Sequence, residues 1–405
     1  MVKKTILRVL LAALVLLLFG LQASQPYPAH SFDAIAEPYR FALARWEASH
    51  LLTSLLPGGP SAQPIPTPEQ VELVRDHFEL GRKINELRIR LEIYELSTGE
   101  RQALEKELGE LEEERAPKEA QVMALLGAQV AEALAEQGLD TSLLWGRVQL
   151  LFPPLRFEFE LLPHVLIVSP RDKIATISST LLRPTLSLAE MEYIEARIAE
   201  LGYSGLVERI GGVATYPSLL ADTVSLEDAL STIAHEWTHH FLFFYPLGRH
   251  YNASYDMTII NETVADIVGH EIGDALIELY QTEEERRQTQ EQDAQAEKEP
   301  GFDFNQAMRE TRLRVDELLA QGRVEEAEQY MEERRLFINA QGYYIRKLNQ
   351  AYFAFHGSYG ESPAATSPIG GELRALREQS ASLGEFVRTV ARISSYQELQ
   401  PLLQE

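Results

Sequence analysis

The stretch of sequence that most constrains this chain runs from His235 to His239 and reads His-Glu-Trp-Thr-His. On an α-helix, residues i and i+4 lie on one face, so His235 and His239 can present two imidazoles to one metal ion while Glu236 points beside them. A catalytic zinc takes three protein ligands and keeps a fourth position for water, and two histidines with one glutamate form an established set. The motif therefore predicts a zinc site that needs one more ligand from elsewhere in the chain.

The residues around this motif favour a helix. Ser225 and Asp228 form a capping-box-like start, and the apolar residues that follow recur at spacings of three and four as far as Leu242. No proline follows until Pro246. We therefore expect both histidines on one continuous helix.

A second segment, from Thr258 to Leu276, supplies the missing ligand. It is apolar at helical spacing and carries Glu262 and Asp266 one turn apart. Glu262 is the expected third ligand of the Zn²⁺ ion. Asp266 is placed to accept the free ring N–H of a zinc-bound histidine, which fixes the tautomer of that ring. Glu236 remains as the general base for the attacking water.

These two segments together resemble the gluzincins, the thermolysin-like clan of zinc metallopeptidases, whose signature is HExxH followed by Asn-Glu-x-x-x-Asp. The matching positions are His235, Glu236, His239, Asn261, Glu262 and Asp266. The resemblance spans the region from about residue 205 to 275. It implies hydrolysis of peptide bonds in a peptide or protein substrate, with zinc held by His235, His239 and Glu262. It also implies that Glu236 acts as general base and that Asp266 supports a zinc ligand.

Other chemistries that share the short motif fit less well. A metzincin continues as HExxHxxGxxH, but Leu242 and Tyr245 occupy those positions. A cysteine-ligated site is excluded because the chain has no cysteine. His240 lies about 100° around the helix from His239, so we expect it to pack or to face solvent. His270 is a spare ligand candidate, which we expect to be a buried or hydrogen-bonded structural histidine.

A tetrahedral intermediate also needs a hydrogen-bond donor for its oxyanion. Gluzincins commonly take a Tyr or His from the more C-terminal part of the chain, and the segment from Leu348 to Gly360 offers His356 and Tyr359 at a helix end that runs into a loop. This segment also resembles the Leu-Asn-x-Ala region of bacterial membrane-linked predicted aminopeptidases. Packing is the alternative role for both residues. The alternative donors are Tyr245, Tyr251 and Tyr255.

The segment from Leu206 to Tyr216 has strand-like character and contains the pair Gly211 and Gly212. It is either an edge strand along which a substrate backbone adds or an ordinary core strand with a bulge. The Gly-x-Met-Glu-Asn motif of many aminopeptidase gluzincins is absent. Endopeptidase and aminopeptidase activity therefore both stay open.

Charge and the amino terminus indicate where such a chain works. The net charge of −24 argues against nucleic acid as a partner. Lys3, Lys4 and Arg8 precede an apolar run over residues 9–21, which is the layout of a signal peptide or signal anchor over residues 1–24. The run is shorter than the roughly 20 residues of a bilayer span. We expect the catalytic part outside the cytoplasm, either secreted or anchored to the membrane through this segment.

The predicted fold class is α+β and mostly helical. A small β-sheet packs on the HExxH helix and the glutamate helix, with an N-terminal helical hairpin and a helical C-terminal part. Alternating patterns predict strands at Arg156–Glu160 and Lys173–Ile177. A separate helix is predicted from Pro117 to Gln137.

The predicted organisation has six parts. They are the signal segment 1–24, a helix and proline-rich linker over 25–66, a coiled-coil-like hairpin over 67–140, the catalytic core over 141–280, a flexible acidic insertion over 281–304 and a helical subdomain over 305–405. The hairpin is solvated surface, a contact for a protein partner or a means of positioning substrate. The alternative from another functional class is an inactive peptidase fold that serves as a scaffold, against which the intact Glu236 argues.

Overall fold

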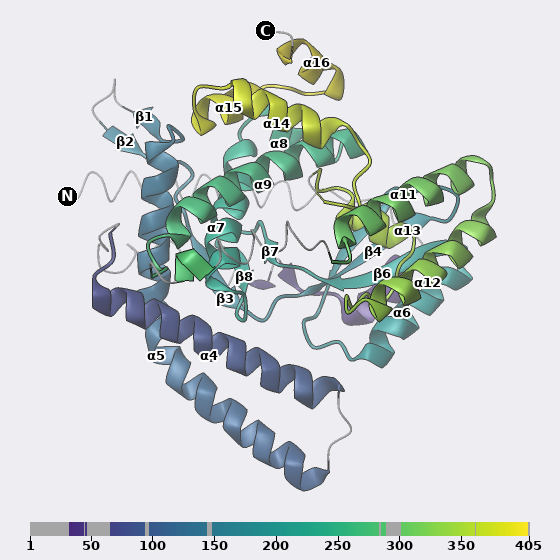
Figure 1. The fold of residues 1–405 in the computed structure, drawn as a ribbon, viewed down its shortest axis with the longest axis horizontal. Helices are drawn as coiled ribbons and strands as arrows, with labels where there is room; N and C mark the ends of the chain where they lie inside the picture. Colours follow the sequence, from purple (N-terminus) through teal and green to yellow (C-terminus); the bar gives the residue numbers. More distant parts are fainter. Residues whose placement is uncertain are drawn as a thin grey trace.

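The computed structural model describes residues 32–43, 45–46, 65–93, 97–143, 148–282, 285–288, 301–360 and 362–403. Within them the protein is mostly helical with small sheets, which confirms the predicted α+β class (Figure 1). The signal segment, most of the proline-rich linker and most of the acidic insertion lie outside the described residues. No helix in the described ranges has the length and apolar character needed to cross a membrane.

The helical hairpin, hereafter the arm, consists of α4 (Pro68–Ile93) and α5 (Thr98–Glu136). Thr67 and Gln70 form a capping box at the start of α4, with bonds of 2.8 and 3.3 Å. Ser97 caps α5 through a second capping box, with Glu100. Ile84 at the base of the arm is fully buried, so the apolar stripe joins the two helices as expected.

The prediction that a new helix begins at Pro117 is wrong. Helix α5 continues through Pro117 without a break. Proline removes one helical N–H, yet Pro117 and Glu113 are both exposed, so water can satisfy the carbonyl that is left without a donor. Beyond this point the buried side chains of α5, such as Val122 and Leu126, hold the helix against the core.

The first three-stranded sheet has the order β5-β4-β6 and is antiparallel. Its strands are β4 (His164–Pro170), β5 (Ser178–Leu182) and β6 (Tyr203–Arg209). Alternate residues of β4 face opposite sides of the sheet. On one side Leu166 and Val168 pack on α6 (Leu188–Glu200), and on the other Val165 and Ile167 pack beneath α13 (Gln350–His356).

The predicted strand Lys173–Ile177 is in fact the connection between β4 and β5. Ser169 explains the difference, because its hydroxyl accepts a hydrogen bond from the Ala175 N–H at 3.2 Å and donates one to the Lys173 carbonyl at 3.3 Å. These side-chain bonds replace ladder pairing over the connection. Pairing resumes only at Ser178.

The second sheet has the order β3-β8-β7. Strand β3 (Phe157–Glu160) lies parallel to β8 (Ser218–Ala221), which pairs antiparallel with the short β7 (Gly212–Val213). A separate two-stranded hairpin joins β1 (Thr141–Leu143) to β2 (Val148–Leu150). The single strand predicted over 206–216 is therefore two strands, β6 and β7, and each forms the edge of its own sheet.

The two motif helices are α7 (Leu226–Leu242) and α9 (Tyr255–Ile277), joined through the short α8 (Pro246–Arg249). They pack along each other at close range. A side chain at Gly269 would lie 2.8 Å from the Ser231 carbonyl oxygen, and one at Gly273 would overlap the Ser231 hydroxyl. Only glycine therefore lets α9 approach α7 this closely.

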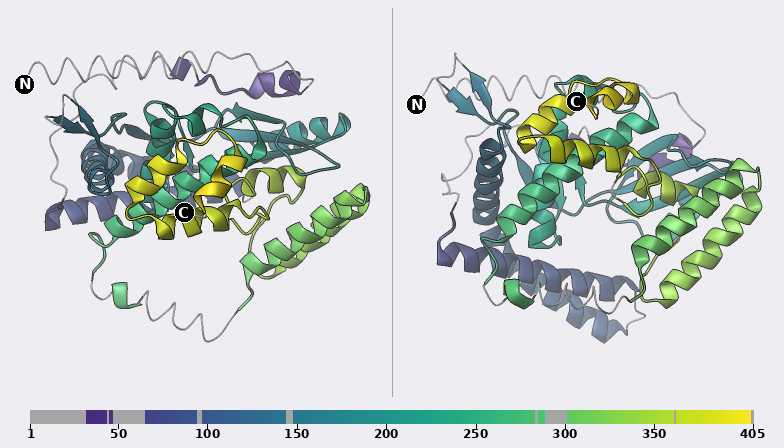
Figure 2. Two further views of the ribbon diagram at one scale, coloured as in Figure 1. Left: turned by 90° about the horizontal axis from the view of Figure 1, so that it is seen from above. Right: turned by 45° about the horizontal axis from the view of Figure 1, so that its top comes forward.

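The remaining helices cover this core. α14 (Ile369–Gln379) and α15 (Leu383–Val390) bury apolar residues against α9, followed by η2 (Tyr396–Glu398) and α16 (Leu399–Leu402). α11 (Phe304–Ala320) and α12 (Val324–Ala340) form an antiparallel pair with a core of their own. Figure 2 shows this pair at the end of the molecule away from α5. α2 (Asp33–Ala36) and η1 (Glu37–Tyr39) lie near α6.

Candidate metal centre

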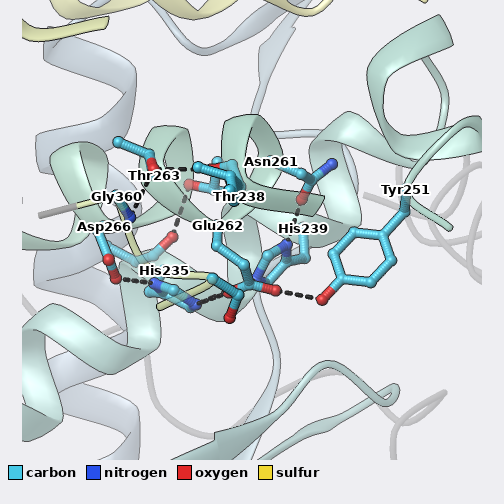
Figure 3. A network of polar contacts seen from close by, with 12 residues as sticks. His235, Thr238, His239, Tyr251, Asn261, Glu262, Thr263, Asp266 and Gly360 are labelled. Atoms are coloured by element: carbon cyan, nitrogen blue, oxygen red, sulfur yellow. Dashed lines mark hydrogen bonds and ion pairs between the residues drawn. The ribbon is translucent and has the colours of Figure 1, made fainter. Parts of the chain in front are cut away.

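Three side chains converge where α7 and α9 face each other. His235 and His239 come from α7 and Glu262 from α9, and one ligand atom of each lies within 4.8 Å of the others. The two Nε2 atoms are 3.0 Å apart, and each lies 3.5 Å from Glu262 Oε2. Figure 3 shows the three donors pointing toward one another. The structure thus brings together the predicted ligands.

The spacing of these atoms fits a zinc ion. Zinc bonds of about 2.0–2.2 Å to nitrogen and oxygen in a tetrahedron place neighbouring donors about 3.3 Å apart. The three measured separations lie on both sides of that value. Two imidazoles and one carboxylate are also a donor set that zinc accepts.

The far side of each donor residue is held by a neighbour. His235 Nδ1 lies 3.0 Å from Asp266 Oδ1, which places the predicted carboxylate on the ring N–H. His239 Nδ1 donates to Asn261 Oδ1 at 2.7 Å. The Tyr251 hydroxyl donates to Glu262 Oε1, leaving Oε2 to face the histidines. Both rings are thereby held in the tautomer whose Nε2 is free to bind a metal.

The sequence does not predict these roles for Asn261 and Tyr251. Asn261 belongs to the matched motif, and its position one residue before Glu262 on a helix is the available signal. For Tyr251 the sequence predicts only an alternative role as oxyanion donor. It lies in the connection before α9, where no periodic pattern indicates which side chain turns inward.

Glu236 lies beside the three donors and is 6% exposed. Burial raises the pKa of this carboxyl, and the carboxylates of Glu262 and Asp266 act in the same direction against the two histidines. Gly212 of β7 lies directly against it, because a Cβ at Gly212 would overlap Glu236 Oε1 and lie 2.9 Å from Thr232 Cγ2. Any side chain at position 212 would therefore displace the carboxylate, and glycine lets the backbone of the edge strand pass close to it.

Tyr359 follows α13 and lines the cleft on both sides of the donor cluster. Its ring centroid is 6.4 Å from that of His235. Burial raises the pKa of Tyr359 well above its usual range, reinforced by Glu262 and Asp266, so the phenol keeps its proton. Thr263 fixes the loop, because its hydroxyl accepts the Gly360 N–H at 3.0 Å.

His356 occupies a different position from Tyr359. It lines only one end of the cleft, and its ring lies 4.2 Å from that of Tyr352. Burial lowers the pKa of His356 to about 4, so the ring is neutral at physiological pH. Of the two predicted oxyanion donors, the structure places Tyr359 at the centre and His356 in the wall.

Two cavities flank the donor cluster and share Gly212, His235, Glu236 and Tyr359 in their walls. The first, of about 370 Å³, continues past Gly211 toward Arg209. The second, of about 350 Å³, continues toward Phe243 and Asn252. A groove therefore runs across the cluster and extends to both sides of it.

The other candidates from sequence lie outside the donor cluster. Tyr245 packs on Phe241 with ring centroids 4.8 Å apart, and the Tyr255 hydroxyl donates to the Ala354 carbonyl at 3.3 Å. His240 is buried, which agrees with the first of the two expected outcomes, packing or exposure to solvent. Of the two forms expected for His270, a buried or a hydrogen-bonded histidine, the buried one is wrong, because this residue is exposed in the wall of the first cavity, one turn beyond Asp266 on the same helix.

Comparison of this chain with protein-family models, curated proteins and solved structures finds no match.

Proposed function

We propose that this protein is a zinc-dependent metallopeptidase that cleaves peptide bonds within peptide or protein substrates. The observation that carries the proposal is the convergence of His235, His239 and Glu262 next to a buried Glu236 in an open groove. Zinc held by the three donors would supply a Lewis acid for the substrate carbonyl and lower the pKa of a water. The resemblance to gluzincins assigns the same roles to the same residues.

The chain's own residues would complete the reaction. Glu236 is the only carboxylate beside the donors that is not engaged by a ring nitrogen or a phenol in the described network, and its raised pKa suits a group that accepts a proton and returns it. It would take the proton of the attacking water and give it to the amine as the C–N bond breaks. The Tyr359 phenol would donate to the oxyanion.

Strand β7 offers a place for the substrate backbone. It is the edge of its sheet, so a substrate strand could add to it by main-chain hydrogen bonds, next to the Glu236 carboxylate against which Gly212 lies. The groove extends beyond the donors in both directions. This favours an endopeptidase, which must accept chain on both sides of the cut, over an aminopeptidase, which needs a closed end.

Location and partners belong to the same proposal. We propose that the catalytic part works outside the cytoplasm, because residues 1–24 have the layout of a signal peptide or anchor. The acidic surface implied by the net charge of −24 does not favour nucleic acid. The arm remains a candidate contact for a protein partner.

The competing proposal is an inactive peptidase fold acting as a scaffold. Metal analysis of the purified protein together with Glu236→Gln separates the two. We expect one zinc per chain in both proteins and a loss of casein cleavage of about 10²–10⁴-fold in the variant, because the general base is removed while the ligands remain.

Glu227→Gln is the matched control, since Glu227 lies exposed in the first turn of the same helix. It should keep full activity. Zinc binding without cleavage by the unsubstituted protein would favour the scaffold, and unchanged cleavage by Glu236→Gln would remove the assigned mechanism. Equal cleavage of peptides with free and acetylated amino termini would favour the endopeptidase.

A further inference from the structure

A third cavity, of about 400 Å³, lies between the arm and the ends of the strands. Helix α4 provides one wall, which includes Arg88 and Ile89. The turn before β4 provides Leu161 and Leu162, and the connection before α6 provides Leu186. In Figure 1 the distal half of α4 runs beneath the region where these strands end. The cavity is therefore built by parts of the chain that are far apart in sequence.

This cavity lies next to the groove at the donor cluster. Arg209 and Ile210 line both the third cavity and the first cavity of the groove. They directly precede Gly211 and Gly212, the second of which lies beside Glu236. Arg209 stands three positions before Gly212, so an extended peptide that runs alongside this segment would reach the third cavity about three residues from the cut.

The chemistry of the cavity suits an apolar side chain. Leu161 is 47% exposed, so much of its side chain is open to a ligand in the cavity. The charge of Arg88 is compensated, since its guanidinium donates to Asp222 at 2.7 Å and to Glu112 at 2.9 Å. An apolar group entering here would cover leucine and isoleucine surface without leaving a charge unpaired.

We propose that the third cavity is a remote substrate subsite, which binds an apolar side chain of the peptide about three residues from the scissile bond. The inference rests on the proposed peptidase function and adds the class of residue that the enzyme selects. It also gives the arm a role, because Ile89 of α4 forms part of the subsite. Cleavage would then depend on substrate residues that lie far from the metal.

A binding experiment tests the subsite without catalysis. The probes are a fluorescein-labelled decapeptide of alternating serine and leucine and the same peptide with alanine in place of leucine. In the Glu236→Gln background, Leu161→Glu should raise the Kd of the leucine peptide about tenfold by placing a charge in the subsite, and leave the alanine peptide unchanged. The matched control is Leu313→Glu, because Leu313 is 51% exposed and lies on α11, which does not line the cavity. Melting curves verify that each variant folds.

Cleavage-site sequencing provides the second readout. In digests of denatured casein, the unsubstituted protein and Leu313→Glu should show enrichment of apolar residues about three positions from the cut, and Leu161→Glu should lose it. The proposal is overturned if the leucine peptide does not bind, or binds equally to Leu161→Glu. If binding depends on Leu161 but no peptide is cleaved, the subsite stands and the peptidase proposal fails. If cleavage occurs with no effect of Leu161, only the subsite fails.

Discussion

Each of the three donor side chains at the candidate metal centre is oriented by a second residue, which hydrogen-bonds to the atom that faces away from the donors. Asp266, Asn261 and Tyr251 hold His235, His239 and Glu262, respectively. Two of these three supports come from α9 and one from the connection before it. The orientation of the α7 histidines therefore depends on how α9 is seated, and loss of such a support typically weakens metal binding or activity by about 10–100-fold.

At the same scale, Tyr359→Phe should separate binding from chemistry. The phenol has no hydrogen-bond partner within the described part of the chain, so its hydroxyl is available to the reacting carbonyl. Removing it should lower kcat about 10²–10³-fold and leave KM and the zinc content nearly unchanged. Steady-state kinetics on an internally quenched peptide would measure this. A change confined to KM would instead assign Tyr359 to substrate binding.

The matching variant His356→Phe is a useful contrast. His356 lies in the wall against Tyr352, and its ring is neutral. If the assignment of the donor to Tyr359 is right, this variant keeps most of kcat. A loss comparable to that of Tyr359→Phe would make His356 the donor or an equal partner.

The site residues that were predicted correctly are those whose relative position follows from their spacing along one helix. His235 and His239 share a face because they are four residues apart on a helix, and Glu262 and Asp266 do so for the same reason. Tyr251 could not be assigned because its hydrogen bond to Glu262 depends on how a connection folds back over α9. The choice between His356 and Tyr359 likewise depended on tertiary packing.

At the scale of elements, the edge strand β7 carries a sharp prediction. Gly212→Ala should lower kcat/KM by at least about tenfold, because the new methyl group would overlap the Glu236 carboxylate and displace it. Gly211→Ala is the neighbouring control, since nothing lies within 4 Å of a Cβ at that position. Peptide cleavage and zinc content should be measured for both.

The two alanine variants also test the placement of Glu236. Zinc should remain bound in Gly212→Ala, because the three donors lie on α7 and α9 rather than on the strand. Equal activity of the two variants would mean that Glu236 does not sit against β7 during catalysis.

Long helices, in which apolar residues recur at helical spacing over many turns, were predicted well, and short strands were not. The arm, α7 and α9 follow from helical spacing and their caps. The strand expected at Lys173–Ile177 failed because the Ser169 hydroxyl takes over its hydrogen bonds. The helix break predicted at Pro117 is wrong. Packing of α5 beyond that residue outweighs the roughly 3 kcal/mol cost of an internal proline.

For the whole molecule, His77 links stability to pH through the contact of the arm with the core. It lies on α4, is 2% exposed and packs near Phe159 with ring centroids 5.8 Å apart. Burial lowers its pKa from 6.5 to about 4, and the charges of Arg115 and Lys118 add to this against Asp76.

The folded state therefore resists protonation of His77 while the unfolded chain does not. The stability that depends on the neutral ring is complete above pH 6.5 and is lost as pH falls toward 4, a difference of about 3 kcal/mol. His77→Phe should remove this part of the pH dependence. Urea unfolding at pH 7 and pH 4.5 would show the variant gaining stability relative to the unsubstituted protein as pH falls, and parallel curves would contradict it.

The close contact of Gly269 and Gly273 with Ser231 has a consequence for metal exchange. Because α7 and α9 are held together by backbone proximity and a shared apolar core, we expect their mutual position not to depend on a metal ion at the three donors. A chelator should then empty the site without unfolding the protein, unlike small zinc domains that fold only around their metal. A different divalent ion could be loaded into the same three donors, which makes the scaffold suited to comparing metals at one fixed geometry.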